Sequence, residues 1–230
     1  MRKLLIAIVL SSSITLLAPG LASASKKSDQ TLSAKVTLQQ SDVPDVFEEL
    51  PIGDEDEAPF SYTCEGAIGT ANDAALAAPH ASSGYKLDES EGYAIINSEV
   101  AVLRNTAAAK KALDAYQGEA AAEACTHTLF AEFLTQPGLT TEVTVGSFSP
   151  ELDDKGSKKV IKGGDEFVGF SVGARRVVEG GEPQFLEAIV VIGRVGRGTF
   201  HLTYITTGVV PVDDVQAMTQ AVVKRLEPAR

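Results

Sequence analysis

The chain has 230 residues, with 20 Lys and Arg against 31 Asp and Glu, and carries a formal net charge of −11. An acidic protein repels phosphate backbones and anionic lipid headgroups, so nucleic acid and membrane surfaces are poor candidate partners. Tryptophan is absent and only 6% of the residues are aromatic, which disfavours a carbohydrate-binding or base-stacking surface.

The N-terminus has the layout of a secretory signal peptide. A positive Met1-Arg2-Lys3 precedes an apolar run from Leu4 to Leu17, and Ala22-Ser23-Ala24 is an A-x-A cleavage signal. We expect cleavage between Ala24 and Ser25, a secreted chain (extracellular or in the cell envelope) and no membrane insertion after cleavage. Removing Arg2 and Lys3 leaves 18 basic against 31 acidic residues, a net charge of −13. We predict a signal peptide over 1–24, a polar linker over 25–40 and one domain over 41–230.

Two cysteines, Cys64 and Cys125, are the only ones in the chain. An even count in a secreted protein predicts a disulfide. Such a bridge closes a loop of about 60 residues, which the chain-entropy description credits with roughly 4 kcal/mol.

The first half of the predicted domain has few sharp signals. We expect a short turn from Ser41 through Phe47 and a short Ala-rich helix over 71–78. The alternating, β-rich stretch 93–104 predicts a strand. Asn105 is a good N-cap for a long Ala-rich helix from Thr106 to about Leu134.

The second half reads as a series of strands. Their predicted ranges are 140–148, 166–178, 183–195 and 199–207. Short Gly-rich linkers join the last three, which favours hairpins and hence an antiparallel sheet. A final helix begins at Asp213 or Asp214, and its apolar positions recur at helical spacing. We therefore predict an α+β fold: one antiparallel sheet of about five strands, with the long helix and the C-terminal helix packed on one face.

Two enzyme signatures overlap in this region. Residues 163–167 (GGDEF) match the motif of diguanylate cyclases, but the upstream metal- and guanine-binding elements of those enzymes are missing. Residues 169–173 (GFSVG) match the nucleophile elbow of serine hydrolases. The elbow needs a helix after the serine, whereas a strand is predicted to continue there. A serine hydrolase using Ser171, with His201 as the base and Glu187 as the acid, is retained as an alternative to a binding protein.

Other candidate sites have weaker support. Cys125 and His127 lie two positions apart on a predicted helix and so face opposite sides. The acidic loop 53–59 lacks the glycine of an EF-hand and reads as a solvated charge run, with weak calcium binding as the open alternative. Neither a metal nor a cofactor is expected. One possible anion-binding patch is formed by Arg175, Arg176, Arg194 and Arg197.

The order of segments over residues 36–226 resembles the PknH-like extracellular sensor domains of actinobacteria and their secreted or lipoprotein relatives. The likeness is carried by LQQSDVPDVF, by INSEVAVLRN, by the Ala-rich stretch ending at Cys125, and by GDEFVGFSV and AIVVIGRVGRGTFHLTYI. The resemblance implies helices flanking a central cleft of an antiparallel sheet, with no catalytic residues. We therefore expect a non-enzymatic, sensor-like domain that binds an unknown small or lipidic molecule, or a cell-envelope protein; a protein-interaction module is a further alternative.

Overall fold

The structure is a computed structural model, and it describes residues 31–32, 35–50, 77, 81–87, 93–118, 120, 124, 139–151, 160–178 and 184–230. The predicted signal cleavage site, the acidic loop 53–59 and both cysteines lie outside these residues, as does the helix predicted over 71–78 except for Ala77. The helix predicted from Thr106 to about Leu134 is not continuous: its first segment ends at Asp114, residues 115–118 are not helical, and most of 119–134 lies outside the described residues. Among the described residues, no helix is long and apolar enough to cross a membrane.

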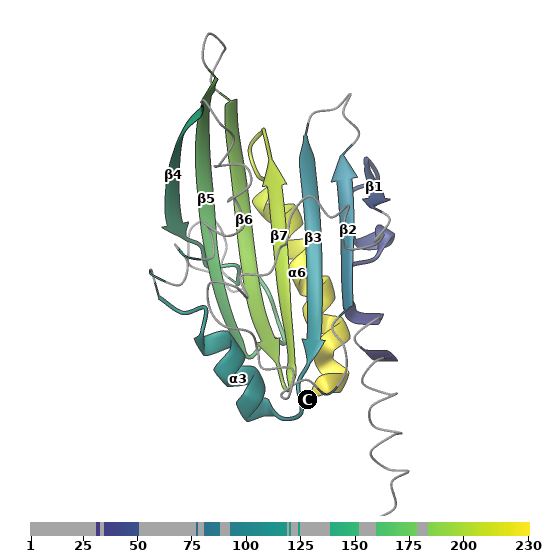
Figure 1. Cartoon of the computed structure of the whole chain (residues 1–230). Coiled ribbons are helices and arrows are strands. Elements are labelled where there is room, and N and C mark those ends of the chain that lie inside the picture. Colours follow the sequence, from purple (N-terminus) through teal and green to yellow (C-terminus); the bar gives the residue numbers. More distant parts are fainter. Residues whose placement is uncertain are drawn as a thin grey trace, which may run out of the picture.

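The described strands form one antiparallel sheet (Figure 1) in the order β1-β2-β3-β7-β6-β5-β4. The strands are β1 (Phe47–Leu50), β2 (Ala81–Leu87), β3 (Ala94–Val102), β4 (Leu139–Ser147), β5 (Glu166–Val178), β6 (Gln184–Val195) and β7 (Gly198–Thr206). The helical elements are η1 (Gln40–Asp42), α3 (Thr106–Asp114), α6 (Val212–Leu226) and η3 (Glu227–Ala229). The α+β class and the antiparallel pairing are confirmed. The expected number of about five strands is too low, since β1 and β2 extend the sheet to seven.

The hairpin between β6 and β7 forms where the glycine-rich sequence predicts it. Val195 pairs with Gly198, leaving Gly196 and Arg197 as a two-residue turn. Gly196 has a φ of 58°, and a positive φ at the first central residue is what a type II′ hairpin turn requires. This tight turn sets the register that decides which side chains of β7 share a face.

The two main helices cover opposite faces of the sheet, so the prediction that both pack on one face is wrong. Alternate residues of β7, including Phe200 and Leu202, belong to a large apolar cluster with Val215 and Val222 of α6. Ile205 of β7 belongs to a second cluster with Leu113 of α3. Because successive side chains of a strand point to opposite sides, these clusters define an α6 face and an α3 face. In Figure 1, α6 runs behind β7 and β3, while α3 lies at the end of the sheet where β7 begins.

The packed chain begins before residue 41, within the segment expected to be a linker. Val36 and Leu38 are 1% and 2% exposed and belong to the α6-face core. Tyr85 of β2 is also buried there, and its hydroxyl donates to the Leu38 carbonyl at 2.9 Å. Burial is the main cause of the raised pKa of Tyr85. Residues 35–40 are therefore part of the domain, because their apolar side chains complete this core.

Candidate ligand-binding face around His201

The α3 face carries polar side chains at its centre and apolar ones beside them. His201 lies between Phe200 and Leu202 in β7; both belong to the α6-face core, so His201 points to the α3 face. Thr203 lies on the same side and is buried. In the adjacent β3, Asn97 and Glu99 are the register partners of Thr203 and His201. These four residues form what we call the polar strip.

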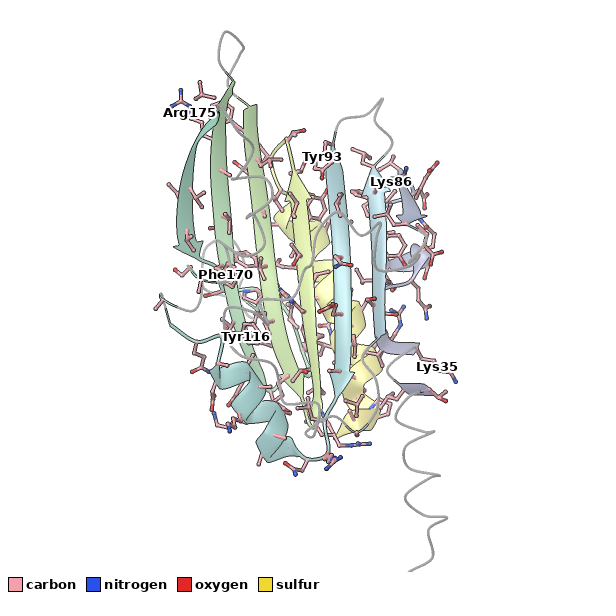
Figure 2. The ribbon with its side chains drawn as sticks, viewed as in Figure 1. Lys35, Lys86, Tyr93, Tyr116, Phe170 and Arg175 are labelled. Carbon is pink, nitrogen blue, oxygen red and sulfur yellow. The ribbon has the colours of Figure 1, made fainter. Side chains whose placement is uncertain are left out.

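The side chains that flank the polar strip on β6 and after α3 are apolar or aromatic. Ile192 of β6 is paired with His201, and Val190 with Thr203; both are buried in the α3-face cluster. The ring of Tyr116, just after α3, lies 6.3 Å from the imidazole of His201, centroid to centroid and tilted by 51°. Figure 2 shows Tyr116 at the α3 end of the sheet, with Phe170 of β5 further along it.

The imidazole of His201 is the least satisfied polar group of this face. Its Nε2 atom is enclosed and has no hydrogen-bond partner within the part of the chain that the structure describes. Burial lowers the pKa of His201 to about 4, because the charged ring loses hydration without gaining a compensating partner. The residue as a whole retains some exposed surface. At neutral pH the side chain is thus an uncharged imidazole, and its Nε2 atom can donate or accept one hydrogen bond according to the tautomer.

The α3 end of this face carries charged residues that pair with one another. The Arg194 side chain is only 10% exposed, and its Nη1 lies 3.2 Å from Asp165 Oδ2. Its Nε lies 3.4 Å from Glu166 Oε2. Asp165 Oδ2 also accepts from the Gly196 amide at 2.6 Å, and Lys110 Nζ of α3 lies 3.7 Å from Glu166 Oε1. The two acidic residues of the GGDEF sequence therefore fasten the start of β5 to the β6–β7 hairpin.

This network also involves the C-terminus. Arg230 Nη2 lies 3.3 Å from Asp165 Oδ1 and donates to the Gly163 carbonyl. The GGDEF sequence therefore has a structural role: its acidic residues hold together the turn at Gly163, the β6–β7 hairpin and Arg230.

The four arginines of the predicted anion patch are not brought together. Arg194 pairs with Thr199 near the hairpin and is committed to Asp165 and Glu166. Arg175 is paired with Phe185, whereas Arg194 is paired with Glu166, nine positions away along β5. Nine residues of strand span roughly 30 Å, and Figure 2 shows Arg175 at the end of the sheet opposite α3. Arg176 adjoins Arg175 in β5, and Arg197 forms part of the turn at the other end.

Ser171 and His201 point to opposite faces of the sheet. Phe170 and Val172 belong to the α3-face cluster, so Ser171 between them faces the α6 side. A serine and a histidine separated by the sheet cannot share a proton. Ser171 continues a regular strand instead of standing on a strand-to-helix turn. Glu187, the acid of that alternative, has its carboxylate Oε2 3.4 Å from the Val210 amide.

The sequence predicts His201 inside a strand, but it did not predict that His201, Thr203, Asn97 and Glu99 share one face of the sheet. The signal was the alternation of TFHLTYITT, in which His201 and Thr203 are out of phase with the large apolar residues. The contribution of Tyr116 and the approach of β3 depend on long-range packing and have no local signature.

The chain was compared with protein families, with curated proteins and with solved structures. No protein-family model matches the chain, and no curated protein matches it. Among solved structures, the chain is similar to the crystal structure of the extracellular domain of PknH from Mycobacterium tuberculosis, with 12% sequence identity and a TM-score of 0.43. The match covers 85% of this chain and 95% of that one. It is a weak resemblance at the level of the fold.

Proposed function

We propose that this chain is a secreted, non-enzymatic binding domain of a sensor-like kind, and that the polar strip on its α3 face binds a small, largely apolar molecule. The observation that carries the proposal is the enclosed, unpartnered Nε2 of His201 among the described residues. A buried polar atom without a partner costs free energy, so such atoms are rare unless they serve a ligand or a water.

The surroundings of His201 define the chemistry of the ligand. Ile192, Val190 and the ring of Tyr116 offer apolar and aromatic contact. Burial lowers the pKa of His201 to about 4, so the imidazole is uncharged at neutral pH. Its Nε2 atom then offers the ligand one hydrogen bond. Lipids and other apolar molecules with a single polar head fit this combination, because an apolar wall with a few placed polar groups is the usual composition of a ligand site.

The proposal is tested by native mass spectrometry of the mature chain recovered from culture medium. A discrete adduct, lost on denaturation, is expected for the unmodified protein. His201→Phe keeps a ring in place but removes Nε2, and it should abolish the adduct.

The matched control is Ser98→Ala. Ser98 is fully buried, and its Oγ also lacks a partner among the described residues. It lies on the α6 face, between Ile96 and Val100 of β3, which belong to the α6-face core. The control should retain the adduct. An adduct unchanged in His201→Phe, or no adduct in any sample, contradicts the proposal.

A further inference from the structure

The two edges of the sheet are built differently. Strand β1 ends one side with four residues, of which Glu48 and Glu49 are exposed and charged. Short, charged edge strands are a common protection against pairing with other chains. Strand β4 ends the other side with nine residues, LTTEVTVGS, and a single charge. In the part of the chain that the structure describes, no strand pairs with its outer side.

The backbone groups that β4 directs outward follow from its pairing with β5. The amide of Phe148 donates to the Gly169 carbonyl at 2.9 Å, in the same register that pairs Ser147 with Phe170. Hydrogen-bonded positions alternate in an antiparallel pair. Residues 140, 142, 144 and 146 therefore bond to β5, while residues 139, 141, 143, 145 and 147 direct their N–H and C=O groups outward.

The outward positions of β4 are complementary to a second copy of the same strand. In an antiparallel pair centred on Val143, residue 139 faces residue 147 of the copy and residue 141 faces residue 145. Each of these positions directs its N–H and C=O outward, so all can hydrogen-bond across the pair. All nine residues are paired in this register, and Val143 meets Val143 of the copy.

Charge repulsion favours the register centred on Val143 over the one centred on Glu142. Centred on Val143, the pair places the strand's one charged residue, Glu142, opposite Thr144 of the copy. A shift that centres the pair on Glu142 would set two like charges directly opposite each other, which is destabilising.

We propose that β4 is a homodimerisation edge, at which two copies of this chain join antiparallel about Val143 and extend their sheets into one. The contact is self-complementary, as the interface of a two-fold dimer must be. The outer ends of the joined sheet are then the short, charged β1 strands, so assembly ends at the dimer.

The proposal is tested by sedimentation velocity of the mature chain over a range of concentrations. Val145→Pro removes an outward N–H while leaving the pairing with β5 intact, because proline is tolerated in edge strands whose N–H faces outward. The Val145 side chain is 37% exposed, so little packing is disturbed. We expect a concentration-dependent dimer for the unmodified chain and at least a roughly tenfold weaker dimer for Val145→Pro.

Two variants of opposite charge at position 144 give an independent test, which does not depend on whether Val145→Pro folds. Thr144 is exposed, and in the proposed register it faces Glu142 of the copy. Thr144→Lys should tighten the dimer and Thr144→Glu should weaken it, each by roughly threefold to tenfold, since two such pairs form. Added salt should tighten the dimer of the unmodified chain, because both copies are acidic.

A chain that stays monomeric up to roughly 1 mM overturns the proposal. So does a dimer that responds neither to Val145→Pro nor to the sign of the charge at position 144.

Discussion

The guanidinium of Arg225 donates to both carboxylate oxygens of Asp42, with Nη1–Oδ2 at 2.5 Å and Nη2–Oδ1 at 2.6 Å. Asp42 lies in η1 and Arg225 in the last turn of α6, so the pair joins the start of the described domain to its end. Arg225 also donates to the Thr37 carbonyl, and Asp42 Oδ2 accepts from the Gln39 amide at 2.7 Å. Planar, two-point pairing of this kind is among the stronger ionic contacts in proteins.

Breaking this pair should destabilise the protein. The Asp42 side chain is only 9% exposed, so Arg225→Gln leaves a largely buried carboxylate without its cation and should cost about 2–3 kcal/mol of unfolding free energy. Urea unfolding of the mature chain measures the loss. The double variant Asp42→Asn/Arg225→Gln should lose less than the sum of the single variants. Strict additivity would show that the two residues are not coupled.

The Arg194 network should depend on guanidinium geometry as well as on charge. Arg194→Lys keeps the charge but cannot reach Asp165, Glu166 and the Gly196 carbonyl together. We expect about 1 kcal/mol of destabilisation for Arg194→Lys and about 2–3 kcal/mol for Arg194→Ala. The alanine variant removes the most buried cation of the network and leaves Asp165 only Arg230 and Glu166 only Lys110 as cationic partners. Thermal unfolding at low ionic strength distinguishes the variants. Equal stability of Arg194→Lys and the unmodified chain would contradict the geometric argument.

His201 should make stability depend on pH in a defined window. Its pKa is lowered from 6.5 to about 4 in the folded state, so the unfolded chain binds the proton more tightly. The contribution of His201 is fully present above pH 6.5 and is lost as the pH falls from about 6.5 to about 4. The shift corresponds to at most about 3 kcal/mol, and partial exposure of the residue reduces it.

The measurement is the unfolding free energy at several pH values for the unmodified chain and for His201→Phe. The difference between the two curves isolates His201 from the carboxylates, which titrate in both proteins. The unmodified chain should lose more stability than the variant between pH 7 and pH 4. Parallel curves would mean that the ring is hydrated in the folded state.

Gly196 and Gly118 form a matched pair for testing the hairpin turn. Both have a positive φ, of 58° and 99°. A Cβ at Gly196 would meet Arg230 Cα at 2.5 Å and the Ala229 carbonyl oxygen at 2.6 Å, whereas a Cβ at Gly118 has no described neighbour within 4 Å. Gly118→Ala should cost about 1 kcal/mol from backbone conformation alone. Gly196→Ala should cost about 3 kcal/mol, because η3 must also shift. Chemical denaturation of both variants gives the comparison, and equal losses would contradict the close packing of η3 on the turn.

The second half of the fold was predictable from local sequence. The predicted ranges of the last four strands agree with β4 to β7 within one residue at each end, and the final helix is α6. Strict alternation, glycine turns and helical spacing act over a few residues, so these elements are encoded where they occur.

Strands β1 and β2 were missed because their sequences, FEEL and ASSGYKL, lack a run of alternating apolar residues. They are strands because β3 offers β2 an edge and β2 in turn offers one to β1. Pairing with a neighbouring strand thus overrides a weak local preference.

By itself, the sequence determined an acidic α+β protein with a series of hairpins, and the position of His201 within a strand. Only the tertiary structure decided that Ser171 and His201 lie on opposite faces, that Arg194 pairs with Asp165 and Glu166, and that β4 is an edge of the sheet formed by the described strands. The physical reason is that side-chain direction in a strand has a period of two, and strand order depends on contacts between distant segments. A motif such as GGDEF or GFSVG specifies residue types, whereas register and pairing decide which of them can meet.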